Sequence, residues 1–291
     1  MGTTTASASK KSAPKKQSAG FTGIKSAFSV MIGCFVFALV IYLCVFGHIS
    51  NFKGGADTGV MFSFLTSGDV GLEPANLMGT VYKGGFVVPV IWTMFFTVIA
   101  LSIERYFAIR TAYGKTSLTK FVANIKAALV ANDFTKAFQI CDAQRGSVAN
   151  VVRATLMKYQ EMDQTDRLTK EQKITTIQKE LEEATALEMP MLQENLPVLG
   201  TIITLGTLTG LLGTVLGMIR SFGALASGEG GANSAALSTG ISEALVNTAS
   251  GIATGALAVI SYNYYTNKID RLTFSLDEVG YSIVQTFSAT H

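Results

Sequence analysis

Four long apolar stretches, separated by polar segments, dominate the pattern of the chain. Each has about 20 residues or more, which is enough for a helix to cross a bilayer. The predicted spans are residues 26–48, 86–106, 195–223 and 237–266. This pattern predicts an all-α fold, that of a polytopic membrane protein with four transmembrane helices.

The polar segments between the spans differ in character. Residues 1–25 form a basic tail without apolar periodicity, which predicts disorder, and residues 49–85 form a glycine-rich loop. Residues 224–236 form a second, short loop. Residues 107–194 are expected to form a helical domain, and residues 267–291 a C-terminal helix that continues the fourth span. The apolar positions of this last helix are Leu272, Leu276, Val279 and Ile283.

Apolar residues in 107–194 recur every three or four positions, as in amphipathic helices that pack together. Asp133 is expected to begin a helix and Gly146 to interrupt one. The charged segment from Thr169 to Asn195 is expected to form one long helix running into the third span, kinked by Pro190 and Pro197. The recurring positions are Phe121, Ile125, Leu129, Phe134, Phe138, Cys141, Val148, Val152, Leu156 and Tyr159.

The basic residues predict an orientation. Five lysines precede the first span, and arginines and lysines follow the second. The positive-inside rule places both groups in the cytoplasm, so residues 49–85 and 224–236 are expected outside. The first span is too long for a typical signal-peptide core, and no A-x-A cleavage site follows it. Four spans return the C-terminus to the side of the N-terminus.

Glycine, threonine and serine are unusually frequent in the third and fourth spans. Small residues spaced three or four apart share a helical face and let membrane helices approach closely. The candidates for helix packing are Gly206, Gly210, Gly213, Gly217, Gly251 and Gly255.

Hydroxyl and carboxylate groups on the same two spans indicate a polar interior. The candidates for a proton pathway through a pore are Thr207, Thr214, Glu243, Asn247, Thr248 and Thr254. Two other interpretations stay open. A threonine hydroxyl can bond back to its own helix. A carboxylate at Glu243 can also be a solvated residue in the first turn, where it suits the helix dipole.

Composition narrows the function classes. The chain has 291 residues, of which 48% are hydrophobic and 15% charged, unlike an ordinary soluble protein. A net charge of +3 does not imply nucleic-acid binding. The three cysteines and two histidines do not cluster, so neither a metal site nor a cofactor is expected. The sequence has no nucleophile elbow, P-loop or dinucleotide fingerprint, so we expect no catalytic residues and no enzyme.

Two segments in consecutive spans resemble the ExbB/TolQ/MotA family of proton-channel subunits, ExbB most closely. They are GLLGTVLGMIRSF at 210–222 and GISEALVNTASGI at 240–252. Residues 133–156 also look like the family's cytoplasmic helical region. The three spans of the family match the second, third and fourth spans here, so the first span has no counterpart. Thr207 and Leu257 stand where relatives often have proline, Leu216 where they have tryptophan, and Asn247 where they have alanine.

The resemblance implies a homo-oligomer, a pentamer in the membrane lipid around an ExbD-like single-span partner. An aspartate in the partner's span would carry protons past Thr214, Glu243 and Thr248, and the partner would act on a TonB-like protein. It also implies a multi-pass protein of the bacterial inner membrane with both termini cytoplasmic. A TolQ-like subunit for envelope maintenance, a MotA-like stator subunit and a non-conducting membrane scaffold are the alternatives.

Overall fold

The computed structural model describes residues 27–53, 73–226 and 233–290. In these residues the regular secondary structure is helical, apart from one isolated β-bridge between Phe52 and Pro74. Four of the described helices are long and apolar enough to cross a membrane. The predicted all-α fold with four spans is therefore confirmed. The predicted tail of residues 1–25 lies outside the described residues.

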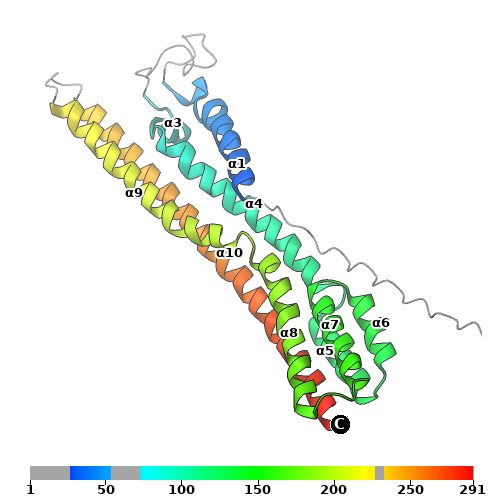
Figure 1. Ribbon diagram of the computed structural model, residues 1–291. Helices are drawn as coiled ribbons and strands as arrows, with labels where there is room; N and C mark the ends of the chain where they lie inside the picture. The colour runs from blue at the N-terminus through cyan, green and yellow to red at the C-terminus, as the bar shows by residue number, and fades with distance from the viewer. Residues whose placement is uncertain (1–26, 54–72, 227–232, 291) are drawn as a thin grey trace, which may run out of the picture. The chain divides into compact units, whose positions relative to one another are not determined.

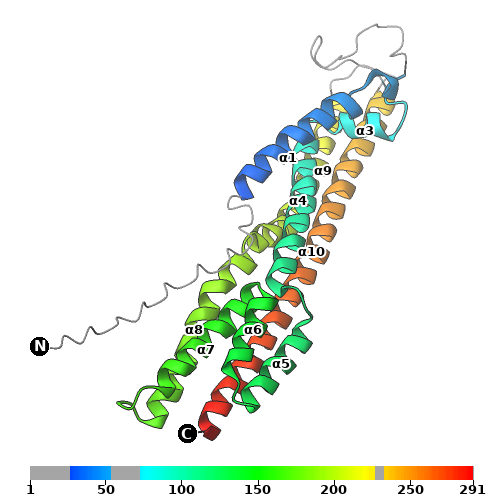
Figure 2. The same ribbon diagram turned by 90° about the vertical axis from the view of Figure 1, so that its right-hand side faces the viewer.

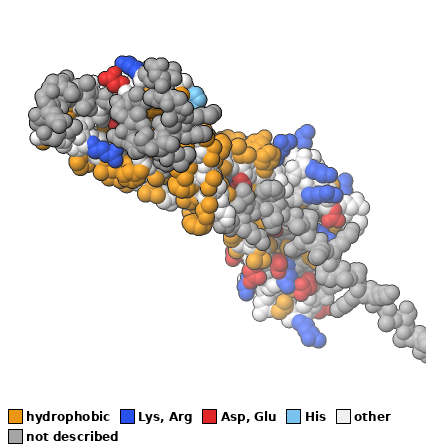
Figure 3. All heavy atoms as spheres, turned by 90° about the horizontal axis from the view of Figure 1, so that it is seen from above, with side chains coloured by type: hydrophobic (Ala, Val, Ile, Leu, Met, Phe, Trp, Pro, Cys, Tyr) orange, Lys and Arg blue, Asp and Glu red, His pale blue; other side chains and the backbone are white. Residues whose placement is uncertain are grey.

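The chain forms two compact units. One contains Thr111–Thr185 and Ser275–His291, and the other contains Gly23–Arg110 and Ala186–Phe274. In the following, they are called the helical unit and the membrane unit. Figure 3 shows a band of hydrophobic side chains on the membrane unit and mixed positive and negative side chains on the helical unit.

The membrane unit draws on all four apolar helices (Figure 1). They are α1 (Ala27–Ile41), α4 (Val87–Tyr113), α9 (Leu196–Ala226) and α10 (Asn233–Thr290). A π-helical turn, Tyr42–Phe46, continues α1, and a 3-10 turn, Ile49–Asn51, follows. Both α9 and α10 extend into the segment expected as a loop at 224–236, of which residues 227–232 lie outside the described residues.

A short helix, α3 (Leu77–Lys83), lies in the segment where the glycines predicted turns. Its start is stabilised because the Asn76 side chain accepts a hydrogen bond from the backbone N–H of Gly79, at 3.0 Å. The helix holds the end of the first span. Tyr42 donates to the carbonyl of Tyr82 at 2.7 Å, and the two rings stack with centroids 4.8 Å apart.

The predicted single helix from Thr169 into the third span is interrupted. Helix α8 spans Lys170–Gln193, and α9 begins at Leu196. Asn195 has φ +66°, a left-handed conformation that no helix continues. The break lies between the two prolines that were expected to kink the chain, with Pro190 inside α8 and Pro197 in the first turn of α9, where proline is tolerated.

The helical unit contains three amphipathic helices, part of α8 and the end of α10 (Figure 2). The three are α5 (Leu118–Val130), α6 (Phe134–Gln144) and α7 (Ser147–Asp163). Their core confirms the predicted periodicity, because most of the recurring apolar positions are buried. The buried ones are Phe121, Ile125, Leu129, Cys141, Val148, Val152, Leu156 and Tyr159.

The predicted boundaries at Asp133 and Gly146 are confirmed. The Asp133 carboxylate caps α6 by accepting from the backbone N–H of Lys136 at 2.9 Å. Gly146 has φ +85° between α6 and α7, a conformation that favours glycine. At the other end of the chain, α10 is one continuous helix of 58 residues. Its predicted apolar positions Leu276, Val279 and Ile283 are buried in the helical unit.

Candidate functional site

Helices α9 and α10 approach each other so closely in the membrane unit that glycines form their contact, which we call the glycine seam. A Cβ added to Gly210 would lie 3.0 Å from the Cα of Gly251. One added to Gly251 would lie 2.6 Å from the carbonyl oxygen of Gly206. A side chain at Gly251 would therefore force the two backbones to move apart.

The other packing candidates lie along the same seam. A Cβ on Gly213 would meet the side chain of Asn247 at 2.7 Å, and one on Gly217 would meet that of Ala244 at 2.7 Å. A Cβ on Gly255 would lie 2.8 Å from the hydroxyl of Thr207. The structure therefore places all six glycines named in the sequence analysis between α9 and α10 of one chain.

Thr214 of α9 and Thr248 of α10 meet across the glycine seam. Their hydroxyls are hydrogen-bonded to each other, and both residues are half-buried. Each hydroxyl is also within hydrogen-bonding distance of the Gly210 carbonyl, at 3.3 Å from Thr214 and 3.0 Å from Thr248. The absence of a side chain at Gly210 leaves that carbonyl open to both.

This arrangement has fewer protons than contacts. Two hydroxyls supply two protons, whereas three contacts join Thr214, Thr248 and the Gly210 carbonyl. Either threonine can therefore donate to the other, and each hydroxyl also carries acceptor lone pairs. A pair that can exchange its donor can solvate a carboxylate in either protonation state, by donating to the ionised form or accepting from the acid.

Two other pathway candidates point into the chain's own interior. Asn247 is 3% exposed and donates from its amide nitrogen to the carbonyl of Gly84 at 3.1 Å, which ties α10 to the end of α3. Its amide oxygen is buried without a hydrogen-bond partner. Thr254 is 1% exposed and bonds back to the carbonyl of Ser250 at 2.9 Å.

Thr207 and Glu243 occupy less enclosed positions. Thr207 is exposed, and its hydroxyl bonds back to the carbonyl of Ile203 at 3.3 Å. Glu243 is half-buried on α10. The structure thus joins the hydroxyls of Thr214 and Thr248, and places Thr207 and Asn247 beside glycines of the same seam.

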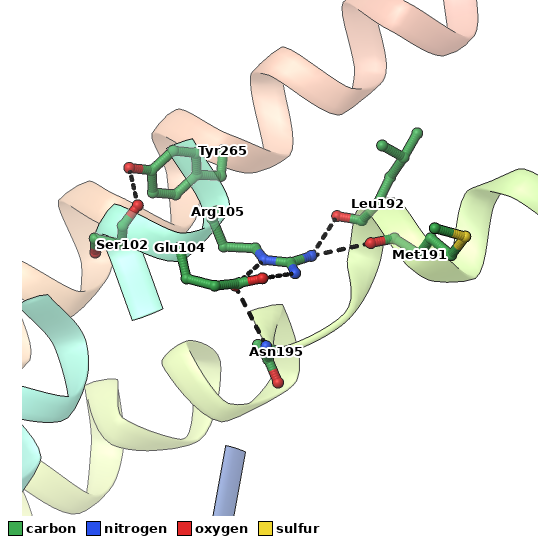
Figure 4. Close-up of polar contacts among 7 residues, drawn as sticks. All are labelled: Ser102, Glu104, Arg105, Met191, Leu192, Asn195 and Tyr265. Atoms are coloured by element: carbon green, nitrogen blue, oxygen red, sulfur yellow. Dashed lines mark hydrogen bonds and ion pairs between the residues drawn. The ribbon is translucent and has the colours of Figure 1, made fainter. Parts of the chain in front are cut away.

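A cluster of buried polar groups, which we call the elbow cluster, lies around the break between α8 and α9 (Figure 4). Arg105 of α4 is fully buried and pairs with its neighbour Glu104 through two bonds, at 2.6 and 2.5 Å. Its remaining nitrogen donates to the carbonyls of Met191 and Leu192, at 3.1 and 3.2 Å. Asn195 donates to the Glu104 carboxylate at 3.3 Å.

Sequence reasoning missed this cluster. Glu104 and Arg105 directly follow an apolar span, where charged residues are usually solvated and indicate only orientation. Consecutive residues on a helix do not face each other, so their adjacency in the sequence did not indicate an ion pair. In the described residues, no group of three or more His, Cys, Asp or Glu side chains could hold a metal ion.

The chain is similar to a known family and to several individual proteins. Residues 145–278 match the model of the MotA/TolQ/ExbB proton channel family. Over 86 residues the chain is 41% identical to a Synechocystis protein named ExbB-like 3, which covers 29% of this chain and 41% of that protein. Over 125 residues it is 30% identical to the Tol-Pal system protein TolQ of Pseudomonas aeruginosa, covering 43% and 54%.

A third relative, from Methanothermobacter thermautotrophicus, is named as an ExbB homolog. It is 36% identical over 90 residues, which are 31% of each protein. The matched segments therefore span between about a third and about half of the relatives' own length. Both the glycine seam and the Thr214–Thr248 pair fall within the residues that match the family.

Proposed function

We propose that the chain, whose residues 145–278 match the model of the MotA/TolQ/ExbB proton channel family, is an ExbB-like subunit of a proton-driven motor. It sits in the bacterial inner membrane with both termini in the cytoplasm, and it conducts protons rather than catalysing a reaction. The observation that carries the proposal is the Thr214–Thr248 pair, two hydroxyls on adjacent membrane helices inside the family match.

Physical chemistry explains why such a pair suits proton transfer. A bare charge in hydrocarbon is very costly, so a proton needs a carrier that is neutral against apolar walls and ionised against polar ones. A carboxylate has that choice. Beside Thr214 and Thr248 the ionised form accepts hydrogen bonds, whereas the leucine and valine side chains of the spans favour the neutral form.

The carrier is supplied by a partner. We propose a pentamer of this chain around an ExbD-like single-span protein with an aspartate in its span. Each proton that crosses releases about 2.3 kcal/mol per 100 mV, which drives movement of the partner against a TonB-like protein in outer-membrane transport. The exposed apolar side chains of α9 support assembly in the membrane. They are Leu205, Leu208, Leu211, Leu212, Val215, Met218, Ile219 and Phe222.

The test replaces both hydroxyls by methyl groups. We expect Thr214→Val with Thr248→Val to assemble with the partner and to lower proton flux into vesicles at least tenfold. The control is Thr201→Val, an exposed threonine of α9 whose hydroxyl bonds only back to its own helix. Undiminished flux in the correctly assembled double variant would contradict the proposal.

A TolQ-like role is the second candidate, because a TolQ protein is among the relatives. The two roles differ in the partner, so complementation separates them. Restored growth of a strain lacking ExbB on a TonB-dependent substrate favours the first, and restored detergent resistance of a strain lacking TolQ favours the second. An assembled complex that conducts no protons would instead favour a scaffold.

A further inference from the structure

The elbow cluster lies at the start of α9, the helix that carries Thr214 of the proposed proton pathway. Building on the proposed function, we propose that Glu104 and Arg105 are positioning residues for it. Their ion pair clamps the break between α8 and α9 to α4, and so sets the register in which α9 lies against α10.

The clamp satisfies groups that the break leaves without partners. Carbonyls in the last turn of a helix lack the N–H donors that a further turn would supply. Here α8 ends at Gln193, and the left-handed Asn195 turns the chain away from the helical path. The Arg105 guanidinium donates to two of these last carbonyls, those of Met191 and Leu192.

The same ion pair also holds the other side of the break. Asn195 directly precedes α9 and donates to the Glu104 carboxylate. Glu104 and Arg105 are neighbours on α4, and both bonds of their ion pair lie within that helix. Carbonyls before the break and an amide after it therefore bind to one fixed point on α4 (Figure 4).

Helix α10 is attached to the same stretch of α4. The Tyr265 hydroxyl donates to the carbonyl of Ser102 at 2.6 Å, two residues before Glu104 (Figure 4). Residues 102–105 thus fix both helices that carry the threonine pair. A change of register at the start of α9 would turn its side chains by about 100° per residue, which would separate Thr214 from Thr248.

Only arginine can bind the Glu104 carboxylate and the two carbonyls of α8 at the same time. Its planar guanidinium binds a carboxylate through two parallel bonds and still has donors for carbonyls on another side. Lysine keeps the charge but offers a single point from which to donate. Arg105→Lys therefore tests the geometry while the charge balance with Glu104 is kept.

The experiment measures register and conduction separately. Spin labels on cysteines at Leu187 and Leu205, both exposed and on either side of the break, report their distance by double electron–electron resonance. Proton flux is measured in vesicles holding the complex with its single-span partner. We expect Arg105→Lys to broaden the distance distribution and to lower flux at least tenfold. Arg110→Lys, at an exposed arginine of the same helix, should change neither.

A second variant covers the case in which Arg105→Lys fails to fold. Glu104→Leu with Arg105→Met removes both charges and leaves no buried ion unpaired, so we expect it to assemble with a broadened distribution and low flux. Unchanged distances in either assembled variant overturn the clamp, and broadened distances with full flux overturn its role in positioning. If the unmodified complex carries no protons, the proposed function fails, while the distances still decide whether the clamp exists.

Discussion

Two glycines of α9 meet different surroundings and predict opposite effects of the same substitution. Gly210 lies in the glycine seam, where an added Cβ would be 3.0 Å from the backbone of Gly251 and 3.1 Å from the carbonyl oxygen of Asn247. Gly223 has nothing within 4 Å of an added Cβ. Backbone atoms cannot move aside as a flexible side chain does, so only the first position resists a methyl group.

We expect Gly210→Ala to destabilise the folded chain by about 1–3 kcal/mol, the usual cost of overpacking. The measurement is thermal unfolding in detergent. Gly223→Ala is the control, and it should be neutral or stabilising by up to about 1 kcal/mol because alanine favours the helix. Equal melting temperatures for the two variants would show that the seam tolerates a wider separation.

The Cys141 thiol is buried in the helical unit, and burial is the main reason that its pKa rises from 9.0 to about 12, with the neighbouring Asp142 adding to the effect. The folded state therefore favours the protonated thiol. Its contribution to stability is fully present below pH 9, because the thiol is then protonated in both states. Above pH 9 the unfolded thiol ionises, and the folded state loses stability relative to it.

The corresponding prediction is a difference between two proteins, because lysines titrate in the same range. The unmodified chain should lose up to about 1.4 kcal/mol of stability per pH unit above pH 9 relative to Cys141→Ala. Chemical denaturation at pH 7 and pH 10 measures this difference. An identical pH dependence of the two proteins would mean that water reaches the thiol.

At the scale of elements, the turn between α6 and α7 packs against the end of α4. Gly146 has φ +85°, and a Cβ there would lie 2.6 Å from the carbonyl oxygens of Thr111 and Ala112. The Gln144 side chain completes the turn by donating to the carbonyls of Tyr113 and Thr116, at 2.7 and 2.9 Å. A left-handed backbone conformation and close packing thus coincide at Gly146.

We expect Gly146→Ala to lower the free energy of unfolding of the helical unit by at least about 1–3 kcal/mol, because the strained backbone and the clash add together. Asn132→Gly is the opposite case. Asn132 has φ +54°, and glycine adopts that conformation without strain, so little or no loss is expected. Circular dichroism during urea titration follows both. A stable Gly146→Ala protein would mean that the turn rearranges.

The elements that the sequence predicted are those with strong periodicity. Phe121, Ile125 and Leu129 repeat at helical spacing, and all three are buried. The misses have physical reasons. Helix α3 depends on one capping side chain, Asn76, within a glycine-rich segment. The break at Asn195 depends on a left-handed residue and on bonds from Arg105, which lies far away in the sequence.

At the scale of the whole molecule, the sequence predicted only part of the candidate site. The composition of the third and fourth spans drew attention to Thr214 and Thr248, and the structure places them in contact. The same composition also named Asn247 and Thr254, which are buried in the chain's own interior. Stripes on a helix face do not reveal which stripe meets another helix, because that depends on how all four helices pack.

The proposed orientation predicts which parts of the chain are accessible from each side of the membrane. In a background without native cysteines, Glu73→Cys should react with a membrane-impermeant thiol reagent in cells with a permeable outer membrane. Asp142→Cys should react only after the inner membrane is opened. Both side chains are about 60% exposed, at 62% and 61%, so burial does not limit the labelling. The reverse pattern would invert the proposed topology.

The closeness of α9 and α10 also restricts how a pore built from them could change its width. Helices whose backbones touch at Gly206, Gly210 and Gly251 have no layer of side chains that could reorganise as one slides past the other. The two helices therefore move together as one rigid pair. A ring of such helix pairs would widen or narrow only if each pair tilted against its neighbours. The contacts between subunits, and not those within one subunit, would then control the width of the pore.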